Sequence, residues 1–147
     1  MRYLADSNVL LRFADRRDPL HGIVRTATRT LWQGGHQIVI TPQNCAEFWN
    51  VVTRPTTRNG FGFGVAEADR LLRIVERLFL LVPDDARVYP VWRRLVVSLG
   101  MSGVQVHDAR LAAAMLLHGI THIITFNIAD FGRYHDAGIV ALNPAAM

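Results

Sequence analysis

Residues 2–13 read RYLADSNVLLRF, an apolar stretch that passes through three polar residues into a second apolar pattern. The first part, Arg2 to Ala5, is typical of a short buried strand. After Asp6-Ser7-Asn8, apolar residues take the spacing of one face of a helix: Val9, Leu10, Leu11 and Phe13. The stretch therefore predicts a strand that runs directly into a helix, with Asp6 at the junction.

The same alternation of strand and helix continues along the chain. Helices are predicted from Asp18-Pro19 to Gly34-Gly35, from Thr41-Pro42 to Arg54-Pro55, from Val65 to Leu81 with a short strand before Pro83, from Asp84 to Leu99, and from His107 to His118. Further strands are predicted at His36–Ile40, His122–Thr125 and Ile139–Leu142, and a loop at Thr56–Gly64. This order indicates an α/β fold with a mostly parallel central sheet covered on both faces.

The composition indicates one globular domain over residues 1–147. Half of the residues are hydrophobic and 19% are charged, which excludes intrinsic disorder. The net charge of +4 comes from 16 Arg and no Lys against 9 Asp and 3 Glu. Guanidinium groups suit a nucleic-acid partner because their planar fork fits phosphate, but a proteome-wide preference for Arg over Lys would produce the same count.

The single cysteine, Cys45, excludes an intramolecular disulfide and favours a reducing, cytoplasmic location. The most apolar runs, Leu78–Val82 and Leu111–Leu117, are too short to span a bilayer, and residues 1–11 lack the apolar stretch of a signal peptide. We therefore expect a soluble cytoplasmic protein with no membrane partner.

Several polar residues are predicted to meet at one edge of the sheet. Asp6 ends the first strand, and Asn127 and Asp130 follow the fourth. Asp108 lies in the first turn of an Ala-rich helix, and Glu47 lies in the helix after the second strand. The carboxyl ends of parallel strands share this edge, and helix N-termini point toward it. Carboxylates gathered there repel one another unless a cation compensates, and oxygen ligands without Cys or clustered His favour Mg²⁺ or Mn²⁺.

Each of these acids also has a purely structural interpretation. Asp6 would cap the first helix, and Asp108 is well placed to stabilise a helix N-terminus. Glu47 is harder to explain in this way, because its helix is largely apolar and a carboxylate there needs a partner. The joint occurrence of the acids at strand ends carries the prediction of a metal site.

Four segments of the chain resemble the signature segments of PIN-domain nucleases, particularly the VapC-type toxins of bacterial toxin-antitoxin pairs. They are ADSNVL (residues 5–10), AEF (46–48), HDARLAA (107–113) and TFNIADF (125–131). The resemblance spans residues 5 to 131 in the family's order, which makes it more specific than any one segment. It implies a three-layer α/β/α fold and a Mg²⁺- or Mn²⁺-dependent endoribonuclease that hydrolyses RNA.

Carried over residue by residue, Asp6, Glu47 and Asp108 match the three acidic positions of the family's metal site. Asn127 stands where many members carry Asp, and Asp130 is the next acid. Asn127 offers a carbonyl oxygen but no charge, which leaves open whether one or two metals bind.

The mechanism that fits is attack by a metal-activated water on the phosphodiester bond. We expect Asp6 and Asp108 to bind the metal directly, Asn127 and Asp130 to bind it directly or through water, and Glu47 to position a water or act as a base. Ser7 is expected to hydrogen-bond beside the ligands. Asn8 is expected to hold the strand-to-helix turn.

The loop at residues 54–64 is a candidate RNA-binding segment. Arg54 and Arg58 would contact phosphates, and the neighbouring Phe61 and Phe63 would either stack on bases or pack the loop or a dimer contact. The family also implies a small antitoxin, which would mask the carboxylates with an arginine, and a homodimer. The apolar stripe between residues 68 and 79 is a candidate dimer surface.

Two alternatives remain at this point. A haloacid-dehalogenase-type phosphatase is strongly disfavoured, because that family requires an acid at the position of Asn8 and a later Lys, and this chain has no Lys. The other alternative is a catalytically weak PIN-like module that binds RNA or a protein partner, which Asn127 and the basic balance would suit.

Overall fold

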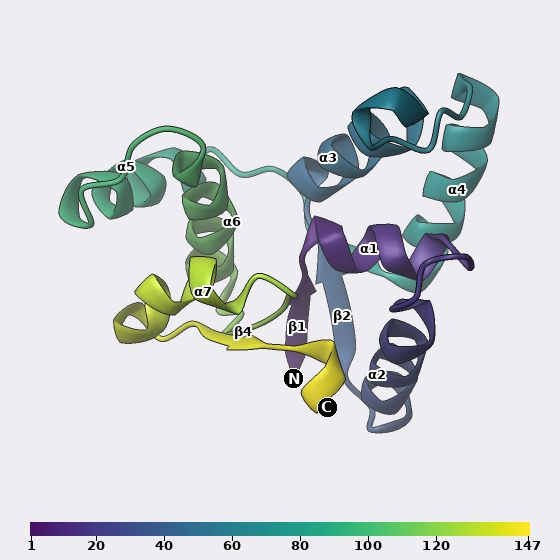
Figure 1. Ribbon diagram of the computed structural model, residues 1–147. Coiled ribbons are helices and arrows are strands. Elements are labelled where there is room, and N and C mark those ends of the chain that lie inside the picture. Colours follow the sequence, from purple (N-terminus) through teal and green to yellow (C-terminus); the bar gives the residue numbers. More distant parts are fainter.

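The computed structural model describes residues 1–147 and has a five-stranded, all-parallel sheet with strand order β3-β2-β1-β4-β5 (Figure 1). The strands are β1 (Arg2–Ala5), β2 (Gln37–Ile40), β3 (Leu80–Leu81), β4 (His122–Ile124) and β5 (Val140–Leu142). The predicted α/β fold with a parallel sheet is confirmed. Since β1 is the central strand, the residue that follows it lies in the middle of the sheet's carboxyl edge.

Seven α-helices connect and cover the strands. They are α1 (Ser7–Ala14), α2 (His21–Gln33), α3 (Pro42–Thr53), α4 (Val65–Leu78), α5 (Val88–Ser98), α6 (Gln105–His118) and α7 (Ile128–Phe131). Three short 3₁₀ turns complete the chain: η1 (Thr56–Arg58), η2 (Gly132–Ala137) and η3 (Pro144–Ala146). None of the helices has the length and apolar character that crossing a membrane requires.

The sheet has a separate apolar core on each face, as the alternation of side chains along a strand requires. On one face, Ala5, Ile40 and Ile124 pack with buried residues of α1, α2, α3 and α4. On the other face, Leu4 and Ile123 pack with α6 and the segment around α7. These two cores produce the three layers of helix, sheet and helix that the sequence predicts.

Local sequence explains where α3 begins. Thr41 caps the helix: its hydroxyl accepts a hydrogen bond from the Asn44 backbone N, and the Asn44 side chain accepts one from the Thr41 backbone N at 2.8 Å. Pro42 at the first helical position has a φ suited to a helix. This reciprocal capping box directs α3 away from the end of β2 and places Glu47 on its second turn.

Two expectations differ from the structure. Helix α5 begins at Val88 instead of Asp84, which puts Pro90 in the first turn, where its missing N–H costs nothing. The apolar stripe between residues 68 and 79 is only partly a surface, because Ala68, Val75 and Phe79 are buried in the chain's own core while Leu78 is exposed.

Candidate functional site

Asp6 lies at the carboxyl end of β1 and is only 6% exposed. Its Oδ1 accepts a hydrogen bond from the Ser7 backbone N at 2.8 Å, so the structural interpretation as an N-cap of α1 holds. Its Oδ2 accepts one from the Thr125 hydroxyl at 2.8 Å and one from Asn8 Nδ2 at 3.3 Å. Burial raises the pKa of Asp6, the hydrogen bonds from Thr125 and Ser7 oppose that rise, and the charge of Asp130 adds to it.

Thr125 joins the two central strands at this edge and is fully buried. Its Oγ1 donates to Asp6 and accepts a hydrogen bond from the Asn127 backbone N at 3.0 Å. Sequence reasoning treats Thr125 only as the end of a strand. The register that pairs Ala5 with Ile124 is the feature that sets Thr125 opposite Asp6.

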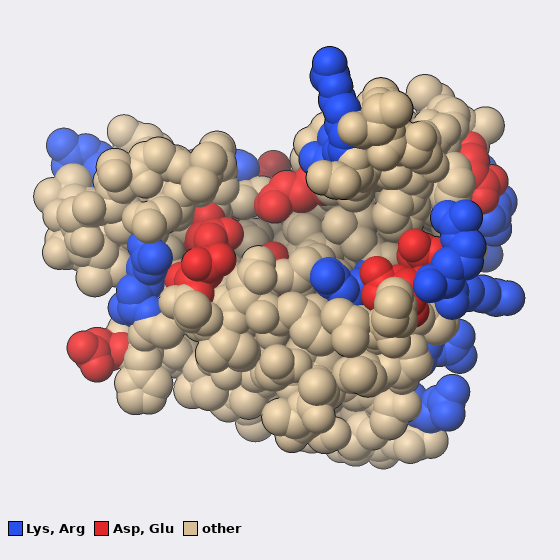
Figure 2. Space-filling view, viewed as in Figure 1, with Lys and Arg blue, Asp and Glu red and all other residues tan.

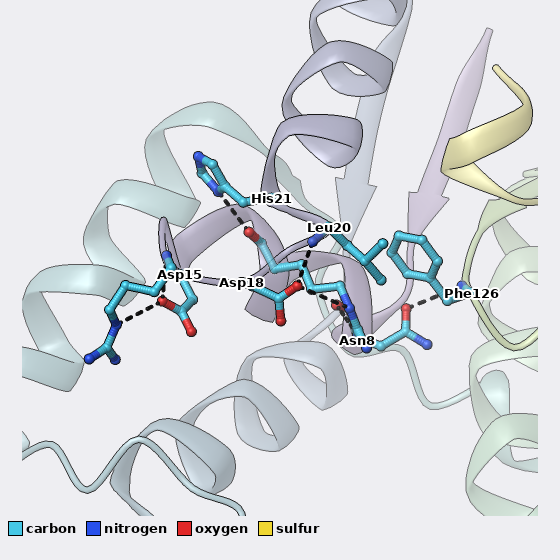
Figure 3. Close-up of polar contacts among 8 residues, drawn as sticks. Asn8, Asp15, Asp18, Leu20, His21 and Phe126 are labelled. Carbon is cyan, nitrogen blue, oxygen red and sulfur yellow. Dashed lines mark hydrogen bonds and ion pairs between the residues drawn. The ribbon is translucent and has the colours of Figure 1, made fainter.

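Ser7 and Asn8 also have defined contacts. The Ser7 hydroxyl accepts a hydrogen bond from Asn44 Nδ2 at 3.2 Å, which ties α1 to the beginning of α3. Asn8 Oδ1 accepts one from the Phe126 backbone N at 3.4 Å, as Figure 3 shows. Asn8 therefore bridges the turn after β1 and the turn after β4, and Asn44 is a second participant that the sequence does not single out.

Asp108 is half-buried in the first turn of α6. Its pKa is raised to about 6, first by burial and then by the charges of Asp6, Asp130 and Glu47, while the charge of Arg133 opposes the rise. The four acids proposed from the sequence thus lie close enough to act on one another electrostatically, although they come from four separate segments.

Glu47 approaches the same region from α3. Burial raises the pKa of Glu47 and the negative charge of Asp6 adds to the rise, whereas the polar side chains of Gln43 and Ser7 and the charge of His107 oppose it. Its Oε1 is buried and accepts no hydrogen bond. Gln43 Oε1, one turn earlier on the same helix, is also buried and also accepts no hydrogen bond. A buried acceptor without a partner costs free energy, and a cation or a water would satisfy it.

Asn127 and Asp130 are exposed on the turn and short helix that follow β4. Asn127 precedes the first residue of α7, but its side chain forms no capping hydrogen bond. Asp130 acts through its charge on both Asp6 and Asp108. The oxygen-only donor set and the unpartnered Glu47 oxygen fit a hard divalent cation. However, no three His, Cys, Asp or Glu side chains have the close spacing of a formed metal site.

The space-filling surface has a hollow between the side formed by α5 and α6 and the side formed by α3 and α4 (Figure 2). Acidic side chains gather along the walls of this hollow. Most basic side chains on this face lie toward its outer edges. The sequence has few acids and many arginines, and the structure gathers several of those acids in one recess of a basic protein.

In the loop proposed to bind RNA, three of the four candidate side chains contact the protein itself. Arg54 turns back on its own loop, where Nη2 donates to the Asn59 carbonyl at 3.2 Å. Phe61 and Phe63 pack on the core beneath α3 and α4 with ring centroids 5.6 Å apart, which favours packing over base stacking. Arg58 is exposed and remains available to solvent.

A groove of ≈ 780 Å³ lies on the other side of this loop. Its apolar lining includes Phe13, Trp32, Phe61, Leu71, Ile74 and Leu78. Five arginines also line it: Arg16, Arg17, Arg25, Arg29 and Arg70. None of the four acids of the carboxyl edge lines this groove, so it is a separate surface feature.

Comparison with known proteins places these features in context. The model of a family described as PIN domain matches residues 3–136. No curated protein matches the chain. Similar solved folds include VapBC-1 from nontypeable Haemophilus influenzae, at 14% identity over 98% of both chains with a TM-score of 0.71.

Two further structures have comparable similarity. FitAcB from Neisseria gonorrhoeae has 18% identity over 100% of both chains and a TM-score of 0.66. VapC20 from Mycobacterium tuberculosis, described as a Sarcin-Ricin loop cleaving toxin, has 18% identity over 94% of this chain and 96% of its own, with a TM-score of 0.64. At such identities these similarities establish a shared fold.

Proposed function

Because the chain belongs to the PIN-domain family, we propose that it is a metal-dependent endoribonuclease and the toxin component of a toxin-antitoxin pair. The observation that carries this proposal is the mutual influence of Asp6, Glu47, Asp108 and Asp130 at one edge of the sheet, where the other three raise the pKa of Asp108. The fold shared with a toxin that cleaves the Sarcin-Ricin loop supports RNA as the substrate class.

In this proposal Asp6, Asp108, Asn127 and Asp130 hold Mg²⁺ or Mn²⁺, which when bound activates a water and neutralises charge on the phosphate. Thr125 and the Ser7 backbone N hold the Asp6 carboxylate in one orientation. Glu47, with its unpartnered oxygen, accepts a proton from the attacking water. The water oxygen forms a bond to phosphorus while the bond from phosphorus to the leaving oxygen breaks. The leaving oxygen takes up a proton from solvent, and Glu47 returns its proton to solvent.

The first test is cleavage of RNA by the purified chain with Mg²⁺ or Mn²⁺, with and without a chelator, for the native protein and Asp6→Asn. The amide oxygen of Asn still accepts a hydrogen bond at the N-cap, so helix α1 should remain intact. We expect at least about a 100-fold loss of rate, equivalent to about 2.7 kcal/mol of transition-state stabilisation. Undiminished cleavage by Asp6→Asn would contradict the metal site.

A second candidate function is a catalytically weak module that binds RNA or a protein partner. The neutral side chain of Asn127 favours this candidate because it lowers the charge available to a second cation. Retention of RNA on the chain without cleavage in either metal would support the module over the nuclease.

We also propose a small antitoxin as partner, since the similar solved structures include the complexes VapBC-1 and FitAcB. An arginine of the antitoxin would pair with the acids of the carboxyl edge. An apolar segment with acidic flanks would occupy the groove between α1, α2 and α4, because its lining is apolar and its five arginines outnumber the two acids that line it, Asp15 and Glu67.

Co-expression with the product of a neighbouring small gene tests the partner and its docking surface. Ile74→Asp and Leu78→Asp change exposed groove residues and should prevent co-purification, whereas Val97→Asp, which changes a still more exposed apolar residue on α5, should not. A complex that survives both groove variants would move the docking surface elsewhere. The homodimer is likewise a proposal, and sedimentation of the purified chain tests it.

A further inference from the structure

The side chain of Arg12, on α1, has three defined contacts near the carboxyl edge of the sheet. Nη1 donates a hydrogen bond to the Asn8 carbonyl at 3.1 Å. Nε lies 3.9 Å from Asp18 Oδ1, an ion-pair distance that is too long for a hydrogen bond. The guanidinium carbon lies 4.9 Å from the centroid of the Phe126 ring. The group is therefore held between an acid and an aromatic face.

These contacts depend on the shape of a guanidinium. Nε is buried and donates no hydrogen bond, so the position of the group comes from stacking and charge more than from Nε itself. A planar guanidinium stacks on an aromatic face, whereas the ammonium of Lys is a compact, strongly hydrated charge. Asp18 is itself fixed, because its Oδ1 accepts a hydrogen bond from the Leu20 backbone N at 2.8 Å.

Phe126 is the residue between Thr125 and Asn127. Helix α1 and the turn before it hold this turn at three points: Asp6 through the Thr125 hydroxyl, Asn8 through the Phe126 backbone N, and Arg12 through the Phe126 ring. Beyond the turn, Phe131 and Tyr134 are buried in the core and fix the far end of α7, whereas Asn127, at its beginning, forms no side-chain cap.

We propose that Arg12 is a positioning residue: by stacking on Phe126 it fixes the turn at residues 125–127 and so holds Asn127 and Asp130 toward Asp6. The relevance to catalysis rests on the proposed nuclease function, but the positional effect belongs to the metal-free chain. Arg12 is not among the groups that shift the pKa of Asp6, Glu47 or Asp108, which agrees with an action through Phe126.

The test is amide hydrogen exchange across residues 125–131 of the metal-free protein, combined with direct titration of Mn²⁺. Arg12→Met keeps the chain length but removes the guanidinium, and we expect exchange in this segment to accelerate about tenfold and Mn²⁺ affinity to fall about tenfold. Arg12→Lys keeps the charge without the plane and should restore less than half of either effect on a logarithmic scale. It also provides a second variant if Arg12→Met folds poorly.

Arg73→Met is the control, since Arg73 is exposed on α4, away from the turn after β4 and outside the groove, and its guanidinium pairs with Asp69 of the same helix at 2.9 Å. It should leave both measurements unchanged. In a chain that already carries Phe126→Leu, adding Arg12→Met should change amide exchange and Mn²⁺ affinity little further. Unchanged exchange at residues 125–131 in Arg12→Met would overturn the proposal, as would a loss of RNA affinity alone, which would make Arg12 a phosphate contact. Failure of RNA cleavage would leave the exchange result intact, so the two proposals fail separately.

Discussion

The carboxyl group of Asp108 has a pKa raised to about 6 from an ordinary value of 3.8, first by burial and then by the charges of Asp6, Asp130 and Glu47. Below the ordinary value the group is protonated in both the folded and the unfolded chain and has no net effect. Between the two pKa values only the unfolded chain ionises, so the free energy of unfolding falls as pH rises. Above about pH 6 the ionised Asp108 carries the full penalty.

Asp108→Asn should therefore stabilise the metal-free protein. At pH 8 we expect the free energy of unfolding to rise by about 1–3 kcal/mol, since one pKa unit corresponds to about 1.4 kcal/mol. At pH 4 the variant and the native chain should differ little. Denaturant unfolding in a chelator measures both values, and Asp136→Asn, an exposed acid, is the control. Equal effects at both pH values would contradict the assigned cause.

The positions of Asp6 and Asp108 could be predicted from the sequence because local spacing reveals a strand end and a helix start, whereas Glu47, on the second turn of α3, was marked by its apolar neighbours and by the family resemblance. Thr125 and Asn44 could not be identified in these ways. Their contacts with Asp6 and Ser7 join residues 119 and 37 positions apart, and depend on strand register and on the packing of α1 beside α3. The distances between the acidic side chains could not be predicted from the sequence either, because these side chains come from separate elements.

At the scale of elements, helix α3 is anchored by the side chain of Asn44, which hydrogen-bonds to the residue before the helix and to the turn after β1. Asn44 is fully buried; its Oδ1 accepts from Thr41, and its Nδ2 donates to the Ser7 hydroxyl. The helix start and the turn after β1 are therefore joined. Glu47, one turn along α3, depends on this anchor for its position.

Asn44→Ala should lower the free energy of unfolding by about 2–3 kcal/mol, because it removes the Asn44 half of the capping box and leaves the buried Thr41 backbone N without an acceptor. Asn50→Ala, an exposed change on the same helix, should alter it by about 0.5 kcal/mol or less. Urea unfolding of the two variants makes the comparison. If they lose equal stability, the capping box does not anchor α3.

The element predictions succeeded where local chemistry sets a boundary and failed where it does not. Thr41-Pro42 marks the beginning of α3, and Gly119 ends α6 with a φ of +66°. The segment 84–87 has helix-compatible residues but lies outside α5, because Asp85 accepts hydrogen bonds from Arg87 in a local turn. Whether the stripe on α4 faces the core or a second copy also depends on tertiary packing, which periodicity alone does not determine.

Across the whole molecule, charge is divided between the carboxyl edge and the rest. Asp6, Glu47, Asp108 and Asp130 account for 4 of the 12 acids, which leaves 8 acids against 16 arginines, or +8, elsewhere. The basic remainder attracts polyanions at long range, while the acids oppose the entry of a phosphate until a cation is present. In the proposed metal site, the same acids would couple cation binding to the stability of the entire fold.

Mn²⁺ should therefore raise the free energy of unfolding of the whole chain in a pH-dependent way. At pH 7.5 and a concentration of about 100 times Kd, the increase should be about 2.7 kcal/mol. At pH 5 and the same concentration it should be much smaller, because protons compete for Asp108, whose pKa is about 6. Thermal unfolding with and without Mn²⁺ measures both, and Asp6→Asn should show little increase at either pH. An equal increase in Asp6→Asn would mean that the cation binds away from the carboxyl edge of the sheet.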